Sequence, residues 1–419
     1  MLTKHSVLPP TESRKPRFFY GYIIVIAGLF IMLITYGARD CFGVFFKPIL
    51  TEFGWTRAAT SGAYSLSYVL FGVGSLVMGR LNDRFGPRIV MTVCGLFLGL
   101  GYLLMSQISA MWQPYLFYGV LFGIGMSSFV PMASTVARWF VKRRGLMTGI
   151  VLSGVGVGTM IMPPVANQLI SSYGWRTSYF IIGIIALVLI VAAAQFLRRD
   201  PGQVGQLAYG AYEVKVDNVD LGTKGFSFRE AVRTRQFWMV SVLFFAFLFY
   251  QHAISVHIVP HATDTGISAI GAASIMSVIG GLSIVGRIVM GSAGDRIGNK
   301  LSLVIVLVLA LGALFGLIAA RELRMFYLFA VLFGFGWGGL SALMSPVVAE
   351  LFGLKAHGAI LGMVLFISAV GGAIGPLIAG RVFDITGSYQ LVFLICVVLS
   401  VMGLILAALL RPTGREGFR

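Results

Sequence analysis

Twelve long apolar runs constrain the fold of this chain more than any other feature. A helix needs about 20 apolar residues to cross the hydrocarbon of a bilayer, and every run reaches about that length. The predicted spans are 19–46, 57–80, 88–108, 112–138, 145–170 and 176–197, then 236–261, 268–292, 301–320, 325–351, 358–383 and 389–410. We therefore expect an all-α membrane protein with twelve transmembrane helices.

The composition excludes a soluble fold. Of the 419 residues, 58% are hydrophobic and 11% are charged, whereas soluble domains are about 45–50% apolar and about 25% charged. The net charge of +17 does not indicate nucleic-acid binding, because the Lys and Arg residues lie in short clusters between the apolar runs. The three cysteines lie far apart in or at the ends of apolar runs, so no disulfide framework is expected.

The basic residues predict the orientation. With the N-terminus in the cytoplasm, 24 basic residues fall in cytoplasmic segments and six fall outside. Cytoplasmic loops are enriched in Lys and Arg, so both termini are expected in the cytoplasm of a multi-pass protein of the plasma (inner) membrane. The first seventeen residues are polar, and we predict no cleavable signal peptide there.

An internal repeat divides the chain into two halves. The run from Gly79 to Arg88 reads GRLNDRFGPR and the run from Gly291 to Lys300 reads GSAGDRIGNK, with Asp83 and Asp295 212 positions apart. An offset of 213 also places Gly174 on Gly387. Such a repeat predicts two pseudo-symmetric six-helix bundles that rock around a central site.

The predicted boundaries follow the polar stretches. They are a cytoplasmic tail over 1–18, a six-helix bundle over 19–198, a linker over 199–235, a second bundle over 236–411 and a tail over 412–419. Within the linker, residues 226–235 are expected to form a short amphipathic helix on the membrane surface. A regulatory role of the linker is an alternative.

These motifs resemble those of the major facilitator superfamily, and the resemblance covers essentially the whole chain. GRLNDRFGPR is similar to the superfamily signature after the second helix. The runs from Tyr36 to Lys47, from Glu52 to Arg57 and from Trp139 to Gly149 resemble the monocarboxylate transporters and the bacterial oxalate/formate antiporters.

The repeated loops predict a charge latch at the cytoplasmic ends of the helices. A carboxylate there can accept backbone amides or pair with arginine, and such a cluster can hold one conformation. The latch candidates are Asp83, Arg84, Arg138, Asp295, Arg296 and Glu350. A solvated loop that only fixes topology is the alternative.

Glycine and proline gather in two helices that the repeat makes equivalent. One contains Gly154, Gly156 and Gly158 before Pro163, and the other contains Gly371, Gly372 and Gly375 before Pro376. Small residues allow close helix contact and proline permits a kink. We expect a hinge or sliding contact between the halves, with static packing as the alternative.

Arg287 is the main candidate for substrate binding. An ionisable residue inside a span is expensive and points to function, and a guanidinium matches a carboxylate. The resemblance implies that Arg287 binds the substrate carboxylate. Pairing with a carboxylate of the protein is the alternative, but Asp40, the acid inside a predicted span, adjoins Arg39 and can neutralise it.

Two departures from the family pattern bear on coupling. Ser283 stands where proton-coupled animal relatives carry an acid, and Asp40 stands where they carry a lysine. The lysine that the oxalate exchanger uses in the eleventh helix also has no counterpart. One clear cationic anchor fits a monoanion, and the remaining candidates for proton coupling are Asp40, His252 and His257.

Depth in the bilayer suggests further residues that line the substrate site. Aromatic walls with a few polar tips suit a small organic acid, although each such residue has packing as its alternative. The candidates beside Arg287 and Ser283 are Tyr36, Ser127, Tyr250, His252, Trp337 and Ser341.

The expected function is secondary active transport of a small monocarboxylate such as lactate or pyruvate, coupled to protons, by alternating access in a monomer. An organic-anion exchanger is the alternative, and a multidrug effluxer would need a buried carboxylate in the cavity. A channel would conduct without saturation. The sequence has no metal-ligand cluster, nucleotide loop or activated nucleophile, so we expect no enzyme activity, cofactor or metal.

Overall fold

The computed structural model describes residues 18–140, 143–210, 225–353 and 356–410. Within these residues the chain is almost entirely helical, apart from two isolated β-bridges. Eleven helical stretches are long and apolar enough to cross a membrane. The stretch Leu146–Gln195 is 50 residues long and holds two spans, because the backbone leaves the helical region at Gly174. The twelve predicted spans are thus confirmed.

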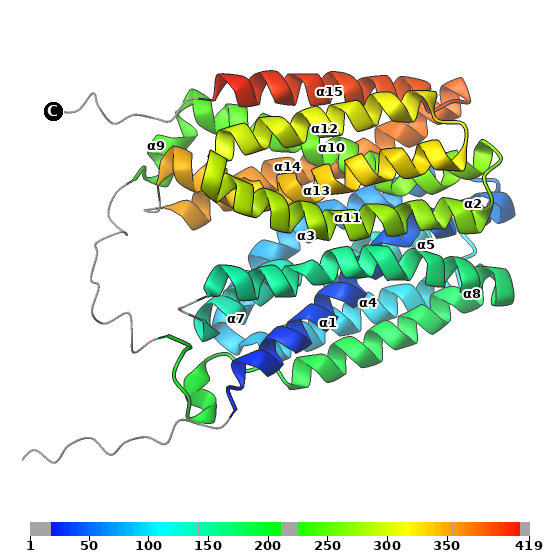
Figure 1. Cartoon of the computed structure of the whole chain (residues 1–419). Helices are drawn as coiled ribbons and strands as arrows, with labels where there is room; N and C mark the ends of the chain where they lie inside the picture. Colours follow the sequence, from blue (N-terminus) through cyan, green and yellow to red (C-terminus); the bar gives the residue numbers. More distant parts are fainter. Residues whose placement is uncertain (1–17, 141–142, 211–224, 354–355, 411–419) are drawn as a thin grey trace, which may run out of the picture.

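The first half contains nine helical elements before the linker (Figure 1). They are α1 (Gly21–Asp40), α2 (Phe42–Phe53), α3 (Arg57–Phe85), α4 (Pro87–Met105), α5 (Trp112–Pro114), the π-helix η1 (Tyr115–Phe122), α6 (Gly123–Gly125), α7 (Phe129–Trp139) and the two-armed α8 (Arg144–Gln195). Together α1 and α2 form the first span, which runs to Phe53.

The linker is short in regular structure, and the second half repeats the spans of the first half with fewer breaks in its helices. The linker holds the 3-10 turn η2 (Pro201–Val204) and α9 (Phe228–Val232). The second half consists of α10 (Arg235–Asp264), α11 (Ala269–Ile297), α12 (Asn299–Ala319), α13 (Leu323–Phe352), α14 (His357–Thr386) and α15 (Gln390–Leu409).

The fourth span departs from the continuous helix that we predicted over 112–138. It is divided among α5, η1, α6 and α7, with a turn at Met126–Ser128. Pro131 has no N–H to bond the carbonyl of Ser127, which weakens the helix at this turn. Close packing also acts here, since a side chain at Gly123 would meet the Ser67 backbone at 2.7 Å.

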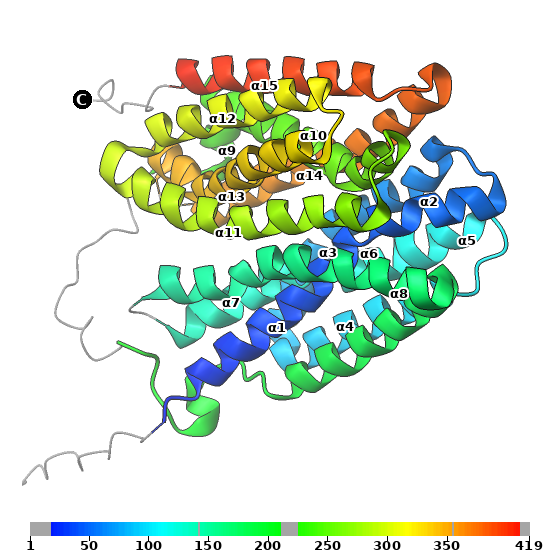
Figure 2. The same cartoon turned by 45° about the vertical axis from the view of Figure 1, so that its right-hand side comes forward.

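The buried apolar side chains form two clusters, one for each half. The first contains mostly residues from Ile24 to Leu197, and the second mostly residues from Ala231 to Leu410. The two bundles are visible in Figures 1 and 2 as the blue-to-green and the green-to-red groups of helices. This is the two-bundle architecture that the repeat predicts, while the exact domain boundaries remain predictions.

Two helix pairs join the halves. α14 packs along α3, and α11 packs along α8. We call the end of the molecule that carries α9 and η2 the linker end, and the other end, which carries α2, the opposite end (Figure 1). Most of the polar contacts described between the halves lie toward the opposite end, while the contact of Arg287 with Leu152 lies on the linker-end side of the middle of α11 and of the first arm of α8.

The linker is anchored to both halves near its ends. Tyr209 donates its backbone N–H to Trp139 in the first half, at 2.9 Å, and Phe226 donates to Phe352 in the second, also at 2.9 Å. The expected helix over 226–235 is only five residues long, Phe228–Val232, and begins with a capping box of Ser227 and Glu230. It packs on the core of the second half.

Candidate functional site

A buried ion pair lies in the middle of the molecule, at the junction of α1 and α2. The Nε of Arg39 lies 2.8 Å from Oδ1 of Asp40, and its Nη2 lies 3.1 Å from Oδ2. The two side chains are 4% and 0% exposed. Thr159 of α8 donates its hydroxyl to the same carboxylate. The expected neutralisation of Arg39 by Asp40 is present in the structure.

Arg287 of α11 has a different environment. Its Nη1 donates to the backbone carbonyl of Leu152 in α8, at 2.8 Å, so the side chain reaches across the boundary between the halves. No carboxylate among the residues that the structure describes pairs with this guanidinium. A half-buried cation with only a neutral partner retains its capacity to bind an anion.

Tyr36 lies beside both arginines. The guanidinium of Arg39 is 4.8 Å from the centroid of its ring, and the charges of Arg39, Asp40 and Arg287 all act on its hydroxyl. That hydroxyl is buried and has no hydrogen-bond partner among the described residues. Buried polar groups are normally paired, so the unpaired donor is a good candidate for contact with a bound molecule.

Ser283 precedes Arg287 by one turn of α11. Its hydroxyl donates to Gly280 in the same helix at 2.7 Å. It also faces α8, because a side chain at Gly156 would come within 2.9 Å of the Ser283 hydroxyl. Ser283 therefore lies at the boundary between the halves, as its expected role requires.

Two histidines of α10 meet α3 across the other boundary. The Nδ1 of His252 is 2.9 Å from the Tyr64 hydroxyl, while its Nε2 has no described partner. His257 uses both nitrogens: Nδ1 is 2.9 Å from the Tyr389 hydroxyl, and Nε2 is 3.0 Å from the carbonyl of Pro376. Of these two histidines, His252 alone has a ring nitrogen without a described partner.

Four other lining candidates fit less well. The Ser127 hydroxyl faces the backbone of α3 and α6 within the first half. Tyr250 packs on Phe247 and Phe333 in the core of the second half, so its role as a lining residue stays a prediction. Trp337 is a buried member of the same core, and Ser341 donates to the carbonyl of Trp337 at 2.9 Å.

For four of the expected latch residues the structure describes surroundings within their own half. Arg138 lies 3.4 Å from Asp200 within the first half, and Glu350 accepts from Asn299 within the second half at 2.8 Å. The guanidinium of Arg84 lies 5.1 Å from the ring of Phe85, and Arg296 is exposed. The side chains of Asp83 and Asp295 lie outside the described residues, so the latch remains a prediction.

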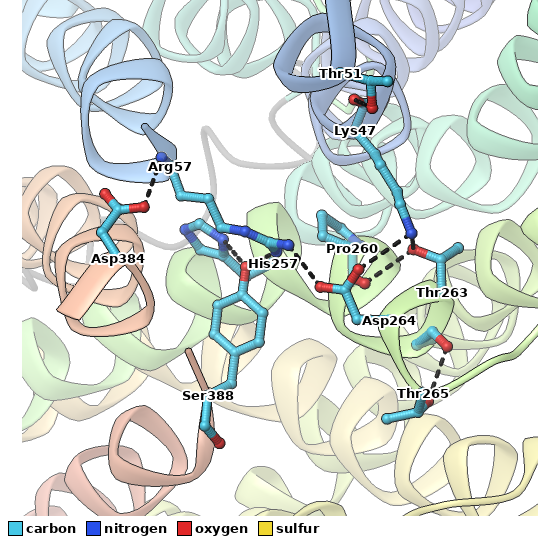
Figure 3. Close-up of polar contacts among 12 residues, drawn as sticks. Lys47, Thr51, Arg57, His257, Pro260, Thr263, Asp264, Thr265, Asp384 and Ser388 are labelled. Atoms are coloured by element: carbon cyan, nitrogen blue, oxygen red, sulfur yellow. Dashed lines mark hydrogen bonds and ion pairs between the residues drawn. The ribbon is translucent and has the colours of Figure 1, made fainter. Parts of the chain in front are cut away.

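A polar network at the opposite end does join the halves, and sequence reasoning missed it (Figure 3). Arg57 of α3 donates through Nη2 to Asp264 of α10 at 2.6 Å and through Nη1 to the Tyr389 hydroxyl at 2.6 Å. Asp384 accepts from the backbone N–H groups of Arg57 and Ala58. The sequence did offer one signal for this network: Arg57 and Asp264 carry opposite charges and lie at span ends that the predicted topology assigns to the same side of the membrane.

Two further features support this network. Lys47 of α2 lies 3.1 Å from Asp264, which therefore pairs with two cations of the first half. The Tyr389 hydroxyl accepts from Arg57 and also lies 2.9 Å from Nδ1 of His257, so it links the two side chains. The network closes the opposite end with charged and neutral hydrogen bonds from α2, α3, α10, α14 and the loop before α15.

The glycine runs lie at the two boundaries. Gly154 and Gly158 face α1, while Gly156 faces Gly280 and Ser283 of α11. In the second half, Gly371 and Gly375 face α10, while Gly372 faces Tyr68 of α3. Each run thus packs on its own half with two glycines and on the other half with one. The expected contact between halves exists, and its use as a hinge remains a prediction.

Comparison with known families agrees with this arrangement. The model of the Major Facilitator Superfamily matches residues 28–338 and, overlapping them, residues 253–417. The chain therefore belongs to the major facilitator superfamily. It is a membrane transporter of this superfamily and not an enzyme, as we expected from the absence of a catalytic motif.

Among members of the superfamily, the chain is similar to monocarboxylate transporters. It is 28% identical to monocarboxylate transporter 13 of Rattus norvegicus over 90% of this chain and 85% of the relative. It is 29% identical to monocarboxylate transporter 12 of Mus musculus over 99% and 89%, and 28% identical to monocarboxylate transporter 4 of Rattus norvegicus over 92% and 82%. The family resemblance is confirmed.

A solved structure has the same fold. It is a bacterial homolog of the human lysosomal transporter Spinster, in an inward-facing and unoccupied conformation, with a TM-score of 0.71 and 17% identity over 94% of this chain and 96% of that chain. At this identity the likeness concerns the superfamily fold alone.

Proposed function

We propose that this transporter carries a small monocarboxylate of the lactate or pyruvate type together with a proton. It acts as a monomer by alternating access in the plasma (inner) membrane, with the linker end in the cytoplasm. The names of the relatives support the substrate class, and the distribution of basic residues supports the orientation.

The environment of Arg287 is the observation that carries this proposal. Its guanidinium lies between the halves with a backbone carbonyl as its described partner, and the unpaired hydroxyl of Tyr36 lies within its electrostatic range. A carboxylate bound there would gain charge-assisted hydrogen bonds in a medium of low dielectric constant. Ser283, one turn away, is the next candidate for contact with the substrate.

For the coupling proton we propose His252 first. Its Nε2 is free among the described residues, and its ring is close to Tyr68, with centroids 4.1 Å apart. His257 is fully engaged in neutral hydrogen bonds, which favours a structural role. Asp40 is already bonded to Arg39 and Thr159, so it is the second candidate.

The contacts between halves support a conformation closed at the opposite end and accessible from the linker end. In this interpretation, the Arg57 network is the gate that opens in the other conformation. The cytoplasmic residues Asp83, Arg84, Arg138, Asp295, Arg296 and Glu350 would hold the halves together as a latch in that second conformation, since alternating access closes one end while the other is open.

Uptake into proteoliposomes tests the substrate and its anchor. Purified protein is reconstituted, and uptake of labelled lactate and pyruvate is measured with and without an inward proton gradient. We expect saturable, gradient-stimulated uptake by the wild type. Arg287→Ala should lose at least about tenfold in kcat/KM, since it removes a charge-assisted contact, and Arg287→Lys should recover part of it.

The matched control is Arg324→Ala, because the Arg324 side chain is 82% exposed and pairs only with Glu322 among the described residues. It should leave uptake unchanged. Full uptake by Arg287→Ala would contradict the anchor. Uptake that requires a carboxylate inside the vesicle and does not depend on the proton gradient would instead identify an organic-anion exchanger.

A further inference from the structure

The ionisable groups in the middle of the membrane have a simple charge balance. Among the described side chains, Arg39, Asp40 and Arg287 are the charged groups that lie near the central boundary and away from the ends of the spans. Arg39 and Asp40 form a pair with two contacts, at 2.8 and 3.1 Å. The pair is neutral as a unit, so the region carries one unbalanced positive charge, that of Arg287.

Arg39 would be a second anion anchor if Asp40 did not occupy it. Its guanidinium lies over the Tyr36 ring, 4.8 Å from the centroid, and it repels Arg287 electrostatically. The neutral groups Tyr64, Tyr68 and His252 also lie within its range. None of these three carries a negative charge that could replace the carboxylate of Asp40.

The pair is held in place from a second helix. Thr159 of α8 donates to Oδ2 of Asp40 and lies one turn from Gly156, which contacts α11. This hydrogen bond fixes the carboxylate toward Arg39 and α8. Asp40 is therefore committed to Arg39 and does not compete with a substrate for Arg287.

We infer that Asp40 determines specificity: by occupying Arg39 it limits the transported anion to a single negative charge. This inference rests on the proposed function and extends it to the charge of the substrate. A monocarboxylate balances Arg287, whereas a dicarboxylate would leave an uncompensated negative charge in a buried region, which is costly. Loss of the Asp40 charge frees Arg39 as the partner of a second carboxylate.

The experiment compares four proteins in the same proteoliposome assay. They are the wild type, Asp40→Asn, Asp40→Glu and the double variant Arg39→Gln/Asp40→Asn. Asp40→Asn keeps the size of the side chain and adds one positive charge to the site. Asp40→Glu keeps the charge, and the double variant removes both charges and restores the balance. Substrates are lactate, malonate and the monoethyl ester of malonate, slightly above neutral pH.

We expect the wild type, Asp40→Glu and the double variant to prefer lactate and the monoester to malonate, whatever the total uptake of each variant. Asp40→Asn should raise the ratio of kcat/KM for malonate to that for lactate by at least about tenfold. The malonate ester shows whether charge rather than size decides, because it is larger than malonate and carries one charge fewer.

Three results would overturn the inference. They are an unchanged preference in Asp40→Asn, gain of malonate uptake in the double variant, and wild-type uptake of malonate equal to that of its monoester. If Asp40→Asn does not fold in a thermal-unfolding control, the last two comparisons still decide. A wild type that takes up no monocarboxylate would instead overturn the proposed function and this extension with it.

Discussion

The guanidinium of Arg57 and the carboxylate of Asp264 lie 2.6 Å apart, and together they join the start of α3 to the end of α10 across the two halves. The side chains are only 14% and 25% exposed, so solvent screens the pair less than an exposed one. Arg57 also bonds Tyr389, which in turn bonds His257. Arg57 thus links Asp264 directly, and His257 through Tyr389, within the proposed gate.

Substitution of Arg57 should shift the conformational equilibrium. We expect Arg57→Gln to weaken the closed opposite end by roughly 1–2 kcal/mol, since it removes charge-assisted hydrogen bonds, and so to raise the open population about 5- to 30-fold. Spin-label distances across the opposite end measure this shift. Arg324→Ala serves as the control, and an unchanged distance distribution in Arg57→Gln would show that the network is not the gate.

Close packing at Gly280 should be necessary for transport. A side-chain carbon at Gly280 would lie 2.5 Å from the backbone nitrogen of Met160 and 2.7 Å from the carbonyl of Gly156, so Gly280→Ala must separate α8 from α11. Overpacking costs about 1–3 kcal/mol, and we expect uptake to fall about tenfold. Gly281→Ala is the control, because its nearest atom is the Met160 sulfur at 3.4 Å. Equal uptake by both variants would argue against a tight boundary.

Replacement of His252 should separate coupling from substrate movement. His252→Gln keeps a polar side chain near Tyr64 but removes the group that can gain a proton. We expect it to lose accumulation driven by a proton gradient and to retain counterflow of substrate. His357→Gln, at a partly exposed site bonded to Ser345, should keep both. Gradient-driven accumulation in His252→Gln would move the coupling role to Asp40.

The break at Gly174 should be intolerant of a side chain. Its φ of 77° and ψ of 162° lie in a region that is essentially restricted to glycine. Gly174→Ala should therefore lower stability by about 1–3 kcal/mol, measured as a fall in the thermal-unfolding midpoint in detergent. Gly149→Ala is the matched control within a helix, with no atom within 4 Å of the added carbon, and it should be neutral or slightly stabilising.

Sequence patterns predicted the spans well because the bilayer imposes length and polarity together. They could not predict the breaks. The turn before α7 depends on Pro131 and on the close approach of Gly123 to Ser67. The element α8 holds two spans without an intervening loop because its backbone changes direction at Gly174. Both are local backbone effects that hydropathy does not record.

The sequence predicted the charged residues of the candidate site, but it predicted less well which side chains face that site. Arg287 and the Arg39–Asp40 pair were found because charge inside a span is costly. Tyr250 and His252 were treated alike because they share a depth, yet residues two apart on a helix point to different sides, and only His252 reaches α3. The Arg57–Asp264 pair joins residues 207 positions apart, a relationship that only the folded chain reveals.

The two crossings at Gly156 and Gly372 have a consequence for how the molecule moves. Each places a glycine of one bundle against the other, in equivalent helices of the repeat. Rotation about the hinge that we predict would require no change of rotamer at either glycine, because glycine has none. We therefore expect the polar contacts at the two ends and the occupancy of the centre to set the energy barrier between conformations, so that cargo and charge govern the rate of switching.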